Sequence, residues 1–194
     1  MFSCSLRYLR CVSLVVVTVP TVSSGGKDGT WGQNGLLCKT FLRSKYVADQ
    51  QTFKVEVLPD TLIRRSSGSI TGHIWITIGD WGFPSQGWDD FPVVILSWWI
   101  EALLSLSAGE NDRATFSFMD GPYFFEIAAP VGDVCSVSFY RNGQTGSELL
   151  REQSCQFGDI RKAVLSAART TIDACQEKKW VSTDLNKLIS TYSN

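Results

Sequence analysis

Four aspartates and one histidine are the residues best suited to acid–base chemistry or metal binding. Asp80, Asp89 and Asp90 flank one loop, and Asp120 lies at a turn. Paired carboxylates can act as a general acid and base or bind a hard cation, but aspartates at such positions more often cap helices or shape turns. His73 is the only histidine, which excludes a histidine-based triad and a His-rich metal site. We therefore interpret these aspartates as cap and turn residues, and a carboxylate-dependent hydrolase is the less favoured alternative.

Other catalytic signatures are missing from the sequence. It contains no glycine-rich phosphate loop of the G-x-x-x-x-G-K or G-x-G-x-x-G type. Its six cysteines include no C-x-x-C pair, so a zinc site or a thioredoxin-type redox centre has no support. We expect no cofactor, no metal and no catalytic residue.

The three cysteines after residue 51 differ in their surroundings. Cys175 lies on the apolar stripe of a helix, and Cys135 alternates with apolar strand residues, so both are expected to be buried. Cys155 is the only one of the three in a polar setting. A reduced cytosolic protein is the simpler account of this cysteine usage.

Tryptophans gather around the same loop as the aspartates. Trp and Tyr dominate binding hot spots, so the loop is either an exposed binding surface or a lid in which Trp81 and Trp88 fold back over a sheet edge. Trp98 and Trp99 point about 100° apart on a helix, so one can enter the core while the other reaches a flank. The candidate partner-binding residues are Asp80, Trp81, Trp88, Asp89 and Trp99.

Length and charge limit the classes of protein. With 194 residues, of which 44% are hydrophobic, the chain is long enough for one folded domain and a short appendage. The net charge of −1 gives no bulk attraction to nucleic acid. Residues 1–46 carry six basic side chains and one acidic one, a charge of +5, which leaves −6 for residues 47–194. We expect this acidic part to meet a basic protein partner.

The first fifty residues differ from the rest, so we divide the chain into a segment 1–50 and a single domain 51–194. Residues 1–10 contain two arginines and no acid, residues 11–22 are largely apolar, and small residues follow. This pattern is typical of a secretory signal. Alternatively the segment is disordered, or is untranslated with a true start near Val47. The protein is expected in the cytoplasm in that last case, and secreted or in the envelope if residues 1–24 are a signal peptide.

Alternation and helical periodicity predict the elements of the domain. Strands are expected at 52–58, 70–79, 114–118, 123–127, 135–139 and, more weakly, 147–153, with turns at Asp120-Gly121 and Asn142-Gly143. Helices are expected at 90–108, from about 159 to 175, and from 182 or 183 onward. The order is ββαββββαα. It predicts an α+β fold with a mostly antiparallel sheet of five to six strands and two long helices and one short helix on one face.

The helix at 90–108 is apolar nearly all round. Glu101 is its only charged residue between Phe91 and Gly109. Asp89 or Asp90 is expected to cap it, with Pro92 in its first turn. Because the strands on both sides need a covering layer, we expect this helix inside the domain and no stable membrane span.

Three segments resemble a known group of proteins. GHIWITIGD at 72–80, FPxxGWDDF at 83–91, which runs into a WWIEALL helix, and FxFMDGPY at 116–123 are similar to small uncharacterised bacterial α+β proteins. Those proteins are similar in layout to immunity proteins that neutralise toxins of interbacterial competition systems. The resemblance covers about 53–188 and implies an α+β fold like that of immunity proteins. Together with the acidic domain, the aromatic loop and the lack of a triad or metal cluster, it leads us to expect a non-enzymatic, immunity-type inhibitor that binds a basic protein toxin. An exported or envelope-associated module of unknown ligand is the alternative.

Overall fold

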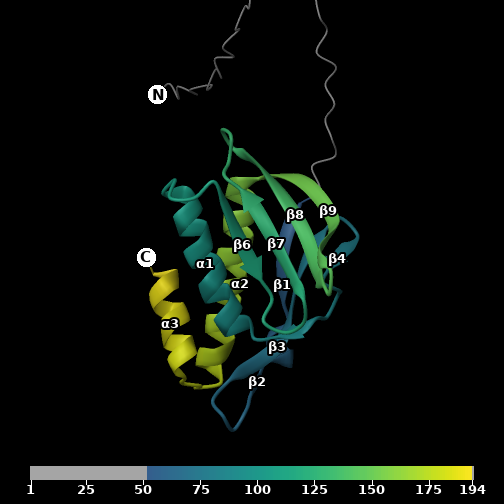
Figure 1. The fold of residues 1–194 in the computed structure, drawn as a ribbon. Coiled ribbons are helices and arrows are strands. Elements are labelled where there is room, and N and C mark those ends of the chain that lie inside the picture. Colours follow the sequence, from purple (N-terminus) through teal and green to yellow (C-terminus); the bar gives the residue numbers. More distant parts are fainter. Residues whose placement is uncertain (1–51, 194) are drawn as a thin grey trace, which may run out of the picture. The chain divides into compact units, whose positions relative to one another are not determined.

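A computed structural model describes residues 52–193 (Figure 1). The predictions made for residues 1–50 lie outside the described residues. Two antiparallel sheets and three α-helices make up the described part. The α+β class and the antiparallel pairing are therefore confirmed.

The first sheet is built around β3 (Ile70–Ile78), whose alternate isoleucines point into the core. β1 (Phe53–Val57) pairs with it along one edge. Three short strands also pair with β3: β2 (Ile63–Arg64), β4 (Trp81–Phe83) and β5 (Asp89–Asp90). A single turn of 3-10 helix (Pro59–Thr61) connects β1 to β2.

The second sheet is a meander of four strands in sequence order: β6 (Arg113–Ser117), β7 (Tyr123–Ala128), β8 (Val134–Gly143) and β9 (Gly146–Gln156). The predicted turn at Asp120-Gly121 is confirmed, and Gly121 has the positive φ of +78° that a side chain would resist. The turn expected at Asn142-Gly143 lies two residues later, because both residues still pair with β9. The last strand is consequently longer than the 147–153 expected.

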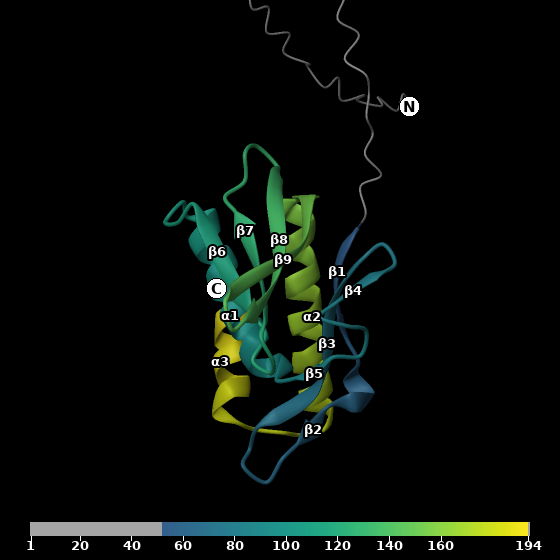
Figure 2. The same ribbon diagram turned by 45° about the vertical axis from the view of Figure 1, so that its right-hand side comes forward.

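The helices are α1 (Pro92–Ser107), α2 (Phe157–Glu177) and α3 (Thr183–Tyr192). Pro92 in the first turn of α1 and Gly109 just beyond its end, with φ +70°, match the expected boundaries. Ser182 caps α3 by accepting from the backbone N–H of Leu185. The three helices pack on one another, and α1 and α3 lie next to each other (Figure 2). Within residues 52–193, none is long and apolar enough to cross a membrane.

Aromatic rings join the two sheets. The ring centroids of Phe53 (β1) and Phe125 (β7) are 6.2 Å apart. Those of Phe83 (β4) and Phe139 (β8) are 4.9 Å apart. The core continues under α1, where Trp99 is fully buried. Its neighbour Trp98 is 41% exposed, so the expected division between these two side chains is confirmed.

The prediction of a single sheet was wrong. After α1 the chain starts a meander whose strands find partners only among themselves, and this second sheet packs on the first instead of extending it. The predicted order also lacked β2, β4 and β5. Strands of two or three residues are too short to show an alternating pattern, so they could not be recognised.

The expected cap of α1 also needs correction. Neither Asp89 nor Asp90 caps α1, because the N-cap residue is Phe91, and Asp90 instead accepts from the Phe91 N–H at 2.8 Å. Cys155 is buried despite its polar neighbours in the sequence, since it faces the core directly opposite Cys135. The expected burial of Cys135 and Cys175 is confirmed.

Candidate functional site

The loop after β3 folds back against the second sheet. Trp81 stacks on Phe83 at 5.4 Å and meets Phe139 of β8 edge-on at 5.0 Å. Phe83 is buried, whereas Trp81 stays half-buried. Of the two arrangements open to this loop, the structure has the lid over the sheet edge, with part of the indole still in contact with solvent.

Trp88 closes the other end of the loop. Its ring meets Tyr123 of β7 edge-on at 5.2 Å, and Phe83 also contacts Tyr123, at 5.8 Å. The indole lies so close to Gly121 that a Cβ there would stand 3.0 Å from the ring. We call the continuous row of rings between the two sheets the aromatic rim; its members are Trp81, Phe83, Trp88 and Tyr123.

Asp90 holds the aromatic rim in place. Its carboxylate is 1% exposed and accepts hydrogen bonds from four donors: the Trp88 indole N–H and the backbone N–H groups of Phe91, Met119 and Asp120, at 2.8–3.2 Å. These bonds join β5 and the start of α1 to the turn between β6 and β7. Burial raises the pKa of Asp90 above its ordinary value of 3.8, and the hydrogen bonds offset part of that rise.

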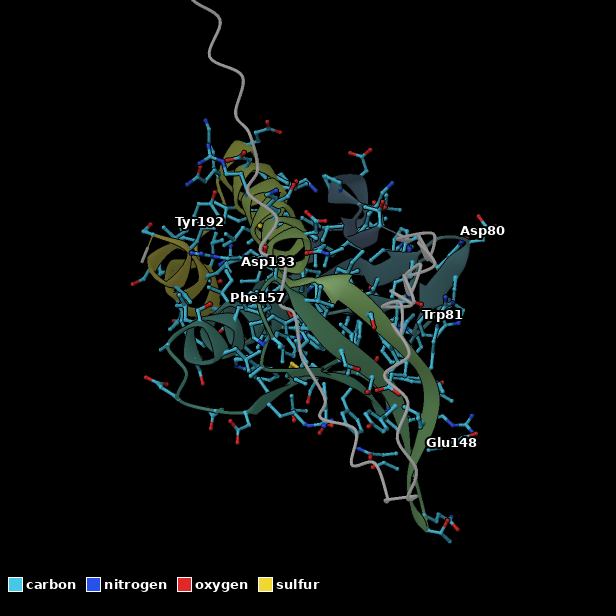
Figure 3. All side chains as sticks on the ribbon, turned by 90° about the horizontal axis from the view of Figure 1, so that it is seen from above. Asp80, Trp81, Asp133, Glu148, Phe157 and Tyr192 are labelled. Carbon is cyan, nitrogen blue, oxygen red and sulfur yellow. The ribbon has the colours of Figure 1, made fainter. Side chains whose placement is uncertain are left out.

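Three exposed carboxylates border the aromatic rim. Asp80 precedes Trp81, Asp89 follows Trp88, and Asp120 precedes Gly121. Figure 3 shows Asp80 directed outward at the edge of the molecule beside Trp81. None of the three forms an ion pair within residues 52–193. Their charges are thus available to a partner.

Arg151 of β9 brings a positive charge to the same place. Its guanidinium lies over the Trp81 ring, 5.1 Å from the centroid. A cation over an indole face is attracted by the ring's electron density. Arg151 therefore covers one face of Trp81, and it fixes the orientation of the ring that the loop presents.

Trp99 is the one candidate that does not reach the surface. It is fully buried, its indole N–H donates to the Ser117 carbonyl at 3.0 Å, and its ring packs on Phe118 and Phe125, each at 5.2 Å. The prediction that Trp99 binds a partner is therefore corrected: it is a core residue that ties α1 to the second sheet.

The acid–base chemistry considered for the aspartates finds little geometric support. Asp90 has both carboxylate oxygens engaged by N–H donors, and Asp80, Asp89 and Asp120 lie exposed on three different segments. Within residues 52–193, no three side chains of the metal-binding types come together. The aspartates thus divide into one structural acceptor and three surface charges.

Sequence reasoning missed the residues that the loop packs against. Tyr123, Phe139 and Arg151 belong to strands far along the chain, and no local pattern links them to the loop. Gly121 differs from these residues. The sequence predicted its Asp-Gly turn, but it did not predict that the turn contacts Trp88.

A separate open groove of about 460 Å³ runs between β1 and α2, away from the aromatic rim. Both signs of charge line it, and the Lys162 ammonium lies 3.6 Å from the Asp159 carboxylate. This mixed lining favours no particular class of ligand. The groove therefore does not compete with the rim as a candidate site.

No family model, curated protein or solved structure matches the chain.

Proposed function

We propose that this chain is a non-enzymatic binding protein of the immunity type, which inhibits a basic protein toxin through the aromatic rim and its bordering carboxylates. The observation that carries the proposal is the pairing of half-buried, firmly held indoles with exposed acids that have no ion-pair partner in the described domain. The other features below support the same function.

Rigidity supports a binding role. Trp81 and Trp88 each contact a ring of the second sheet, and Trp88 also donates to Asp90. Side chains that are already ordered lose little entropy when a partner binds, which strengthens association. Tryptophans held in this way are suited to be anchors of an interface.

Charge supports a basic partner. Residues 52–193 carry seventeen acidic and twelve basic side chains, a net charge of −5. Asp80, Asp89 and Asp120 add local negative charge at the rim. Such a field accelerates association with a basic protein and disfavours acidic ones.

The test is a co-expression experiment with a toxin candidate, a protein from a neighbouring gene that stops growth when it is expressed alone. The wild-type chain is expected to restore growth, and a Trp81→Ala, Asp80→Asn, Asp89→Asn variant is expected to lose that protection. Trp98→Ala is the matched control, because Trp98 is exposed on α1 and lies outside the rim. Failure of the wild-type chain to protect would contradict the immunity function, and full protection by the triple variant would contradict the rim as its site.

A further inference from the structure

Cys135 and Cys155 lie directly opposite each other on neighbouring strands. β8 and β9 are antiparallel, and the register pairs Cys135 with Cys155 between Val134–Gln156 and Ser136–Ser154. Directly opposed residues of an antiparallel pair send their side chains to the same face of the sheet. Both cysteines are buried on the face that looks into the core, and both are free thiols here.

The spacing of this pair suits a disulfide bond. Opposed residues in antiparallel strands have Cα atoms about 4.5 or 5.5 Å apart, depending on whether the pair exchanges backbone hydrogen bonds. A disulfide requires about 4.4–6.8 Å. Either kind of pair therefore meets the requirement on the Cα separation.

One of the two sulfur atoms, Cys135 Sγ, is directed at the opposite residue. Cys135 Sγ lies 3.6 Å from the carbonyl oxygen of Cys155, so it already reaches across to the opposite residue. Cys175, the third free thiol of the described residues, lies on α2 and has no such opposite cysteine. Two residues beyond the cysteine pair, the backbone N–H of Phe157 donates to the carbonyl oxygen of Asp133 at 2.9 Å. Both residues are labelled in Figure 3. The pair thus lies in the regular, firmly anchored part of the hairpin.

We propose that Cys135 and Cys155 are a modification site that forms a cross-strand disulfide when a disulfide oxidant such as oxidised glutathione is present. One cysteine thiolate attacks the oxidant, forms a mixed disulfide and releases one glutathione thiol. The second cysteine thiolate attacks the protein sulfur of the mixed disulfide and releases the other glutathione. The two cysteines lose two protons and two electrons, and the oxidant becomes two thiols.

Burial determines when this reaction takes place. It raises the pKa of Cys135 to about 12 and the pKa of Cys155 to about 11, so little thiolate exists in the folded domain near neutral pH. The thiolate is the attacking species. The bond therefore forms while the hairpin is folding or transiently open, and the folded reduced protein reacts slowly.

The experiment compares the full chain refolded in glutathione redox buffer with the folded, reduced chain placed in the same buffer. Remaining thiols are then alkylated, and the protein is digested without reduction and mapped by mass spectrometry. We expect a linked peptide pair that contains Cys135 and Cys155, lighter by two hydrogen atoms than the separate peptides. We expect the bond to form faster during refolding than in the folded chain.

Stability provides a second measurement. The bond closes a loop of about twenty residues and is expected to raise the melting temperature of the oxidised chain by roughly 10 °C over the reduced chain. Cys135→Ala and Cys155→Ala should each abolish the rise, and Cys175→Ala should preserve it. Alkylation of both Cys135 and Cys155 in the refolded wild-type chain, or their linkage to other cysteines, would overturn the proposal even if a variant failed to fold.

Discussion

The indole N–H of Trp88 donates to Oδ2 of Asp90 over 3.2 Å, and this bond makes a loop residue part of the contact between the two sheets. The same carboxylate accepts from Met119 and Asp120 in the turn between β6 and β7. The aromatic rim is therefore held by a buried charge as well as by ring packing, and its orientation depends on Asp90.

Asp90→Ala should destabilise the domain by about 3 kcal/mol, because buried N–H donors would lose their acceptor. Urea unfolding followed by tryptophan fluorescence measures the change. Asp89→Ala is the matched control, since Asp89 is exposed and its loss should change the free energy of unfolding by less than about 0.5 kcal/mol. Equal effects of the two substitutions would show that Asp90 is not a structural acceptor.

The pH dependence of stability provides a test of the Asp90 environment. Because burial raises its pKa in the folded state, the folded protein binds more protons than the unfolded chain from about pH 3.8 up to the raised pKa. The Asp90 contribution to stability is therefore complete below pH 3.8 and decreases as the pH rises through that window. The difference in unfolding free energy between wild type and Asp90→Ala should be smaller at neutral pH than at low pH. A difference that grows with pH would mean that the pKa is lowered instead.

Gly121→Ala should perturb the rim in two ways. A side chain at φ +78° costs about 1–2 kcal/mol, and its Cβ would also stand 3.0 Å from the Trp88 ring. Gly132→Ala isolates the first effect, because Gly132 has φ +65° and open space around it. We expect Gly121→Ala to be the more destabilising by about 1 kcal/mol in thermal or urea unfolding. Identical losses would indicate that Trp88 does not pack on this turn.

The adjacent tryptophans of α1 allow a direct comparison of core and surface. Trp99→Ala should cost about 4 kcal/mol, because it empties a fully buried site and removes the donor to Ser117. Trp98→Ala should cost less than about 1 kcal/mol at its half-exposed position. Unfolding midpoints in urea measure both, and a larger loss for Trp98 would contradict the described orientation of α1.

The sequence predicted the elements that have a clear period or a strong local signal. The alternation of Ile74, Ile76 and Ile78, the Asp-Gly turn before β7, and the start of the last helix at 182 or 183 all correspond to observed features. Each depends on residues close in the chain. Local physics is sufficient to predict such features.

The parts that were missed depend on contacts between distant residues. Nothing near Trp81 in the sequence indicates that Phe139 and Arg151 will surround it. Aspartate is a residue type that often caps helices. The Asp90 carboxylate instead accepts from the backbone N–H groups of Met119 and Asp120 in the turn between β6 and β7, so tertiary hydrogen bonds replace the cap. The division into two sheets has the same origin, since strand pairing is decided by packing that a single sequence does not reveal.

The proposed partner is a basic protein toxin. The affinity of the purified full chain for a toxin candidate taken from a neighbouring gene, measured by calorimetry across a salt series, tests the central claim most directly. Binding should weaken as salt increases, and Trp81→Ala should reduce the affinity by roughly thirtyfold, the loss typical of an interface hot spot. Asp80→Asn with Asp89→Asn should flatten the salt dependence, and Trp98→Ala should bind like the wild type. Unchanged affinity of Trp81→Ala, or no binding by the wild-type chain, would contradict the assignment of the aromatic rim as the site that inhibits a basic partner.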